Sequence, residues 1–97
     1  MITFEWSEGK NRRNRRKHGI DFATATRVFN DPNALMAYDG VAAGEDRWRA
    51  IGRTSSHAVA VVAYSLRGAA DSEVIRVISA RWATKEESQR YEAQVFS

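Results

Sequence analysis

Residues 58–64 of this 97-residue chain read AVAVVAY, and this run decides the fold class. Its side chains are apolar at both alternating sets of positions, which is typical of a strand buried on both faces at the centre of a sheet. Residues 73–82 form a second such run, in which Arg76 lies among aliphatic side chains. A turn predicted over residues 67–71 joins the two runs, and so short a connection favours antiparallel pairing.

Residues 47–53 precede this pair and alternate in character, as a half-buried strand does. Trp48, Ala50 and Gly52 share one face. The other face is largely basic and carries Arg47, Arg49, Ile51 and Arg53. We expect two shorter strands at residues 2–6 and 34–38, a loop over residues 39–46 and a turn over residues 54–57.

Helix signals flank these strands at both ends of the chain. A helix is predicted over residues 8–18, with Ser7 as its N-cap and Gly19 as its C-terminal stop. Asp21 caps a second helix, which carries an apolar stripe of Phe22, Ala25 and Phe29 and ends before Pro32. Thr84 and Glu87 have the spacing of a capping box, which predicts a third helix over residues 85–95.

Together these elements predict an α+β fold in a single domain over residues 1–97. Its sheet is mainly antiparallel with four to five strands, and it has two N-terminal helices and one C-terminal helix. The chain has no cysteine, which excludes disulfides and fits a reducing compartment. No apolar run reaches about 18 residues and the N-terminus lacks a signal-peptide pattern, so we expect a cytoplasmic protein with no membrane contact.

Several classes of enzyme are disfavoured by the residues that are missing. The chain has two histidines and none of the HExxH, P-loop or GxSxG motifs, and its carboxylates are scattered. We therefore predict no metal site and no cofactor. Trp6, Trp48 and Trp82 are interpreted as core residues rather than as platforms for base stacking.

The positive charge is concentrated at one end of the chain. Residues 1–20 carry a net charge of +4, whereas residues 21–97 carry −1. Six cations fall within residues 10–17, and their mutual repulsion would be relieved by a polyanion such as RNA. The alternative is that this helix presents an ordinary solvated face or a surface for a protein partner.

Four further residues have both a chemical and a structural interpretation. His18 could move a proton near neutral pH or could simply cap and pack its helix. Arg76 could contact a phosphate or form an internal ion pair, because a lone charge in a central strand is costly. Arg81 could bind phosphate or lie free on the surface, and Tyr91 could act chemically or pack in the core.

Short segments along nearly the whole chain resemble the BrnT toxin family. In the first half these are residues 4–6 (FEW) with Lys10 and Asn11, residues 17–22 (KHGIDF) and residues 28–32 (VFNDP). In the second half they are residues 45–47 (EDR), 51–53 (IGR) and 75–81 (IRVISAR), with Ala83, Thr84 and Tyr91. The KHG and IRVISAR elements are specific when they occur together at this separation.

The resemblance implies a RelE-like fold and the toxin of a type II toxin–antitoxin module. It implies a ribonuclease that stops translation, and a BrnA-like antitoxin whose ribbon-helix-helix domain binds operator DNA. The toxin itself would then reach operator DNA only through the antitoxin, and a toxin–antitoxin heterotetramer is compatible with this scheme.

We therefore predict a metal-independent endoribonuclease in which the 2′-OH of RNA is the nucleophile. The predicted catalytic residues are Lys17, His18, Arg53, Arg76, Arg81 and Tyr91. Lys17 or His18 would transfer protons, the three arginines would hold phosphate charge, and Tyr91 is a further candidate. The predicted RNA-binding residues are Lys10, Arg13, Arg16, Arg47 and Arg49.

The alternative is a non-catalytic basic module that binds nucleic acid or an acidic protein. A structural subunit with only solvating cations is a third hypothesis, in which Arg76 would have no purpose. An enzyme would require His18, Arg53, Arg76 and Arg81 to converge on one cleft, whereas scattered positions would favour binding alone.

Overall fold

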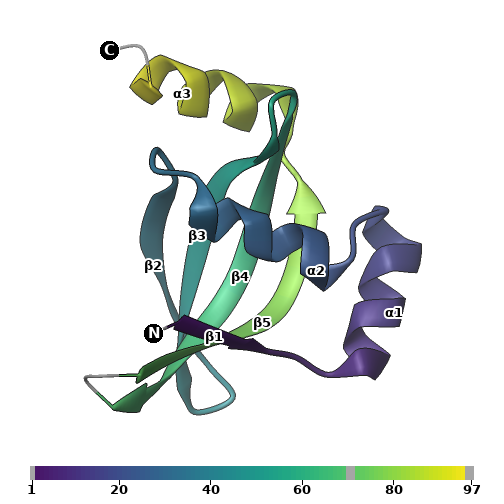
Figure 1. The fold of residues 1–97 in the computed structure, drawn as a ribbon, viewed down its shortest axis with the longest axis vertical. Helices are drawn as coiled ribbons and strands as arrows, with labels where there is room; N and C mark the ends of the chain where they lie inside the picture. Colours follow the sequence, from purple (N-terminus) through teal and green to yellow (C-terminus); the bar gives the residue numbers. More distant parts are fainter. Residues whose placement is uncertain (1, 70–71, 96–97) are drawn as a thin grey trace.

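A computed structural model describes residues 2–69 and 72–95. Figure 1 shows one twisted sheet with helices around it, and the strand order is β1-β5-β4-β3-β2. The strands are β1 (Ile2–Glu5), β2 (Leu35–Ala42), β3 (Glu45–Ser55), β4 (Ala58–Ala69) and β5 (Ser72–Trp82). The helices are α1 (Glu8–His18), α2 (Phe22–Ala25), the 3₁₀ helix η1 (Thr26–Asn30) and α3 (Lys85–Val95).

The predicted fold class and the central position of residues 58–64 are confirmed. β4 lies in the middle of the sheet, and its neighbours β3 and β5 are both antiparallel to it. β1 pairs in parallel with β5, so the sheet is mixed while remaining mainly antiparallel. The segment between β1 and β2 contains α1, α2 and η1, which lie beside and over the sheet (Figure 1).

The core forms between one face of the sheet and the layer made by α2 and η1. Phe22, Ala25 and Val28 of this layer are fully buried, as are Ala50 and Val62 of the sheet. The predicted second helix therefore buries its apolar stripe. It continues as a 3₁₀ helix after Ala25, and Val28 is buried more completely than the predicted Phe29.

Three predicted loops are shorter in the structure than the sequence suggested. The expected loop over 39–46 is mostly strand, because β2 continues to Ala42 and β3 begins at Glu45. Gly40 is accommodated by a register shift between Tyr38 and Gly40 and by its positive φ of 95°. β3 includes residues 54 and 55, and β4 extends through residue 69, so Arg67 is a strand residue; residues 70 and 71 lie outside the described part.

The tryptophans are not all in the core. Trp6 and Trp48 pack against the core cluster, as predicted. Trp82, at the end of β5, is 39% exposed, which contradicts the prediction. The reason is its position at the last residue of the strand, beyond the area that α2 and η1 cover.

α1 attaches to the sheet through polar contacts. Its predicted caps are confirmed, because Ser7 Oγ accepts a hydrogen bond from Lys10 N and Gly19 adopts φ 73°. The buried Asn14 side chain donates to the carbonyls of Ile20 and Ala80 and accepts from the Ala80 amide, at 2.8–3.1 Å. β1 pairs with β5 only as far as Arg76, so Asn14 satisfies the edge of β5 beyond the end of β1.

Replacing Asn14 with alanine should lower the free energy of unfolding by about 3 kcal/mol, because buried backbone groups of β5 lose their partners. Urea denaturation followed by circular dichroism measures this change. Asn33→Ala is the matched control, since Asn33 is exposed. A change in Asn14→Ala no larger than that of the control would show that α1 is held by other contacts.

α3 is tied to the end of β5 by its capping box. The Thr84 amide donates to Glu87 Oε1, and the Glu87 amide donates to Thr84 Oγ1, as the sequence predicted. Arg81 adds a bidentate pair to the two Glu87 oxygens at 2.6 and 2.9 Å. The hydrogen bonds from Arg81 lower the pKa of Glu87 from 4.5 to about 2.

Glu87→Gln should destabilise the protein by about 1 kcal/mol at neutral pH, since one charged partner of Arg81 is lost. The folded-state pKa lies below the unfolded one, so this contribution is complete above pH 4.5 and disappears as pH falls towards 2. Urea unfolding of both proteins from pH 6 to pH 2 should show the difference shrinking. A difference that stays constant would contradict the assignment, and Glu86→Gln, on the same turn, should show almost none.

Candidate functional site

The face of the sheet opposite α2 and η1 carries five of the predicted site arginines, and we call it the arginine face. Ala50 and Gly52 of β3 are buried against the helical layer. Side chains alternate along a strand, so the intervening arginines of β3 point the other way. Cross-strand register adds two arginines of β5 to this face. Its members are Arg47, Arg49, Arg53, Arg76 and Arg81.

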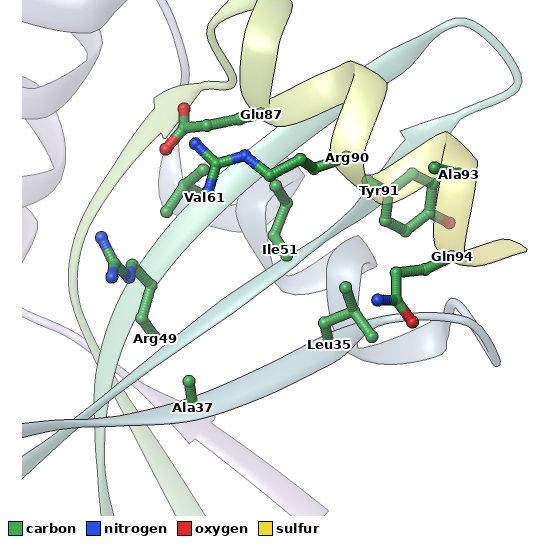
Figure 2. A pocket seen from close by; sticks show the side chains of 10 residues that line it. All are labelled: Leu35, Ala37, Arg49, Ile51, Val61, Glu87, Arg90, Tyr91, Ala93 and Gln94. Atoms are coloured by element: carbon green, nitrogen blue, oxygen red, sulfur yellow. The ribbon is translucent and has the colours of Figure 1, made fainter.

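A hollow of about 580 Å³ separates α3 from this face. Figure 2 shows its apolar floor, formed by Leu35, Ile51 and Val61 from three neighbouring strands. Arg49 from the sheet and Arg90 from α3 add positive charge to its lining (Figure 2). The hollow thus offers apolar surface next to guanidinium groups, a combination that suits a ligand with both flat rings and negative charge.

Asp31 connects β3 to α3 by contacting Tyr91, a residue that lines the hollow. Its Oδ2 accepts hydrogen bonds from the Arg53 amide at 2.8 Å and from the Tyr91 hydroxyl. Burial raises the pKa of Asp31, but the hydrogen bonds from Arg53, Tyr91 and Asn33 outweigh it and hold the pKa below its usual value. The carboxylate therefore stays ionised and anchors both elements.

Tyr91 is 1% exposed and its hydroxyl is used in this contact. Burial, followed by the Asp31 contact, raises the pKa of the Tyr91 phenol. Its ring also lies 5.7 Å from the Arg53 guanidinium, which bonds to Glu92 and to the Ser56 carbonyl. Tyr91 thus supports Arg53 by packing, which is the structural interpretation that the sequence left open for it.

The predicted phosphate-holding arginines lie at two ends of the arginine face. Arg53 and Arg81 each pair with a glutamate of α3, Glu92 and Glu87 respectively. Arg76 lies about 13 Å farther along the sheet, because its partner Ser65 and Arg81's partner Val61 are four residues apart on β4, and it pairs with Glu5 at 3.3 Å. Three arginines so arranged can contact different phosphates of one strand but are too far apart to surround a single one. The convergence of His18, Arg53, Arg76 and Arg81 on one cleft, which was expected of an enzyme, is therefore not seen, and none of the four lines the hollow.

The predicted residues of α1 lie at the edge of the sheet. Lys10, Arg13, Arg16 and Lys17 are exposed, and His18 is partly buried. Within residues 2–69 and 72–95, no hydrogen bond or ion pair joins Lys17 or His18 to the arginine face. The end of α1 lies beside the last residue of β5, because a Cβ at Gly19 would be 3.9 Å from Trp82 Nε1, and alternation turns Trp82 to the face opposite Arg81.

Sequence reasoning missed Asn14, Asp31, Ser65 and the glutamates that pair with the arginines. For Asn14 a signal existed, because Asn11, Asn14 and His18 occupy one stripe of a helix whose other faces are cationic. Asp31 was interpreted only as part of a chain break before Pro32. Glu5, Glu87 and Glu92 gave no signal, since each lies on a different element from its arginine, whereas Glu45 is two residues from Arg47 on the same strand.

The described residues contain neither a metal-ligand cluster nor a membrane-spanning helix. No group of three or more His, Asp or Glu side chains gathers there as metal ligands. No helix in the described ranges has the length and apolar character needed to cross a membrane.

Comparison with known proteins identifies the family. A family described as the ribonuclease toxin BrnT of type II toxin–antitoxin systems matches residues 6–87. The chain is also similar to the 1.1 Å crystal structure of the Brucella abortus ribonuclease toxin BrnT, with 31% identity and a TM-score of 0.63 over 88% of this chain and 99% of that one. No curated protein sequence matches it. The chain therefore belongs to the BrnT family of ribonuclease toxins of type II toxin–antitoxin systems.

Proposed function

We propose that this toxin is an endoribonuclease that cleaves RNA without a metal ion, using the substrate 2′-OH as the nucleophile. The observation that supports it best is the gathering of five arginines on one face, beside a hollow with an apolar floor. Guanidinium groups bind phosphates in bidentate fashion, and apolar surface suits unstacked bases.

The reaction requires three things of the protein. A base removes the 2′-OH proton, and the resulting oxyanion attacks the adjacent phosphorus. Positive charge then stabilises the pentacoordinate phosphorane. Finally an acid protonates the 5′-oxygen as its bond to phosphorus breaks, which leaves a 2′,3′-cyclic phosphate and a 5′-OH. Both protons are accounted for, and no external oxidant, reductant or metal is needed.

The proposed roles follow from residue chemistry and position. Arg53 and Arg81, near the hollow, stabilise the reacting phosphate, and Arg76 holds charge at the other end of the face. Lys17 or His18 transfers protons from the end of α1, which lies against the same end of β5 as Arg81. Tyr91 is kept as a further candidate, although its hydroxyl would first have to leave Asp31.

The remaining proposals concern partners. A BrnA-like antitoxin with a ribbon-helix-helix domain neutralises the toxin and connects it to operator DNA, in an assembly that includes a heterotetramer. The toxin acts in the cytoplasm, where translation takes place. Lys10, Arg13, Arg16, Arg47 and Arg49 bind the RNA backbone. The competing function, a basic module that binds without cleaving, predicts RNA binding with no cleavage.

Purified toxin should cleave single-stranded RNA equally well with and without EDTA. An oligonucleotide with 2′-deoxyribose at the scissile position should resist cleavage, because it has no nucleophile. Gel analysis of the products should show 2′,3′-cyclic phosphate ends. Loss of cleavage in EDTA, or cleavage of the 2′-deoxy substrate, would refute the proposed mechanism, and binding without cleavage would favour the binding module.

In the same assay at subsaturating RNA, Arg81→Ala should slow cleavage about 100-fold, since it removes a preorganised positive charge from the reacting phosphate. Arg76→Ala should slow it about tenfold, because it removes a charged contact to a different phosphate and so weakens RNA binding. Both variants should fold, because the two side chains are only partly buried. Arg27→Ala is the control, since Arg27 is exposed on η1. Arg67 is unsuitable as a control because it shares Glu5 with Arg76. Wild-type rates in both test variants would place the reaction elsewhere on the molecule.

Induced expression of the toxin in bacteria should arrest growth, and Arg81→Ala should relieve the arrest in proportion to its lost cleavage. Co-expression of the cognate antitoxin should restore growth of the wild type. Optical density measures growth, and immunoblots show whether the wild type and the variant are present at equal levels. Normal growth with wild-type protein present at the same level as the variant would contradict the toxin function.

A further inference from the structure

Two polar atoms on the arginine face are buried without any hydrogen-bond partner, Ser65 Oγ and Arg47 Nε. Ser65 is 1% exposed, and burying an unpaired hydroxyl normally costs stability. Glu45 Oε1 lies 4.0 Å from Arg47 Nε, which is beyond hydrogen-bond distance. Native proteins rarely leave such groups unsatisfied, so a missing partner has to be identified.

The two atoms belong to one row of side chains that crosses the sheet. Ser65 of β4 is the register partner of Arg76 on β5. On its other side Ser65 lies next to Arg47 of β3, because the preceding residue of β4, Tyr64, pairs with Trp48. Alternation puts all three side chains on the arginine face. Ser65 therefore forms the centre of the row, with a guanidinium-bearing residue on each side.

Charges around the row leave an excess of cations. Glu5 pairs with Arg67 and Arg76, and Glu45 pairs with Arg47 and Arg67, at 3.3–4.0 Å. Three arginines thus share two carboxylates, and the cluster has one positive charge that is not compensated. The side chains of Arg47 and Arg76 are 25% and 31% exposed, so part of each is open to solvent. Ser65 Oγ and Arg47 Nε are buried, so an oxygen reaches them only once the side chains that cover them move.

The chemistry of the two orphan atoms defines the missing partner. Arg47 Nε–H is a donor and has no lone pair to offer, and the Ser65 hydroxyl can donate as well. One acceptor oxygen between them would satisfy both, and the excess positive charge favours an anionic acceptor. We propose that Arg47, Ser65 and Arg76 form a phosphate-binding subsite for the RNA backbone, a proposal that rests on the ribonuclease function above.

This subsite is separate from the reacting phosphate beside Arg81. Arg81 aligns with Val61 and Ile51, four residues along β3 from Arg47, which corresponds to about 13 Å. The subsite therefore binds a different phosphate of the same strand and contributes affinity and register rather than chemistry. Because it contacts only backbone, its contribution is independent of base sequence.

Inorganic phosphate is the first probe. Arginine Nε–H groups give resolved signals in ¹⁵N–¹H NMR spectra, so titration with phosphate should shift the Arg47 Nε signal along a saturating curve. The Arg27 Nε signal is the internal control, since Arg27 is exposed on η1 and lies outside the arginine face and the hollow. Ser65→Ala should weaken the Arg47 response about tenfold, as expected for one hydrogen bond to a charged group. Equal, non-saturating shifts of both signals would overturn the subsite and leave water as the partner.

The second probe is a 2′-O-methyl RNA oligonucleotide, which cannot be cleaved, followed by fluorescence anisotropy. Ser65→Ala, and Arg47→Lys, which keeps the charge but removes the Nε donor, should each weaken binding about tenfold. Ser55→Ala, an exposed serine in the same sheet, is the control and should bind as the wild type does. Circular dichroism should show all three variants folded, since Ser65→Ala removes only an unpaired hydroxyl.

The outcomes separate this inference from the proposed function. If the wild type cleaves and binds RNA but Ser65→Ala and Arg47→Lys bind as tightly, the subsite is wrong and the ribonuclease function stands. If the wild type neither binds nor cleaves RNA while phosphate still shifts Arg47 along a saturating curve, the ribonuclease function is wrong and the anion site stands.

Discussion

The close approach of the helical layer to Gly52 is the constraint on which the rest of the structure depends. A Cβ at this position would lie 3.0 Å from Val28 and 3.1 Å from Ala34 and Asp31, so a larger residue would push the layer away from β3. The contact places Asp31 where it can accept hydrogen bonds from the Arg53 amide and Tyr91, which anchors α3. Because strands alternate, the same contact turns Arg53 and its basic neighbours to the opposite face.

The arginine face is preorganised by glutamates rather than left as free charge. Arg81 and Arg53 are held by glutamates of α3, and Arg76 by Glu5 of β1. Each pair is only partly buried, so its net stabilisation is small. Its main effect is to limit the rotamers of a long side chain, which reduces the entropy lost when a phosphate is bound. An incoming phosphate has to compete with these carboxylates for the arginines. An RNA strand competes better than a single ion, because several of its phosphates can each bind an arginine at the same time.

Sequence patterns predicted those elements whose signals are local. The α1 and α3 boundaries follow from Ser7, Gly19 and the Thr84–Glu87 box, and the two faces of residues 47–53 follow from alternation. The prediction of a loop over residues 39–46 was wrong. Gly40 is normally a turn signal, whereas here it lies at a bulge of the edge strand β2. The pairs of Arg76 with Glu5 and of Arg53 with Glu92, the bonds of Asn14 to Ala80 and the orphan Ser65 depend on how distant elements come together, which no local pattern contains.

The cations of the molecule thus divide into two groups with different physical effects. Within the described residues, no ion pair within 4.0 Å involves the cations of α1, whereas every arginine of the arginine face has a carboxylate partner. Unpaired surface charges act over about a Debye length and raise the rate at which a polyanion arrives. Paired, partly buried arginines act only at contact and fix the position of what has arrived. In the proposed ribonuclease, α1 therefore attracts RNA from the edge of the sheet, and the arginine face determines which phosphate reacts.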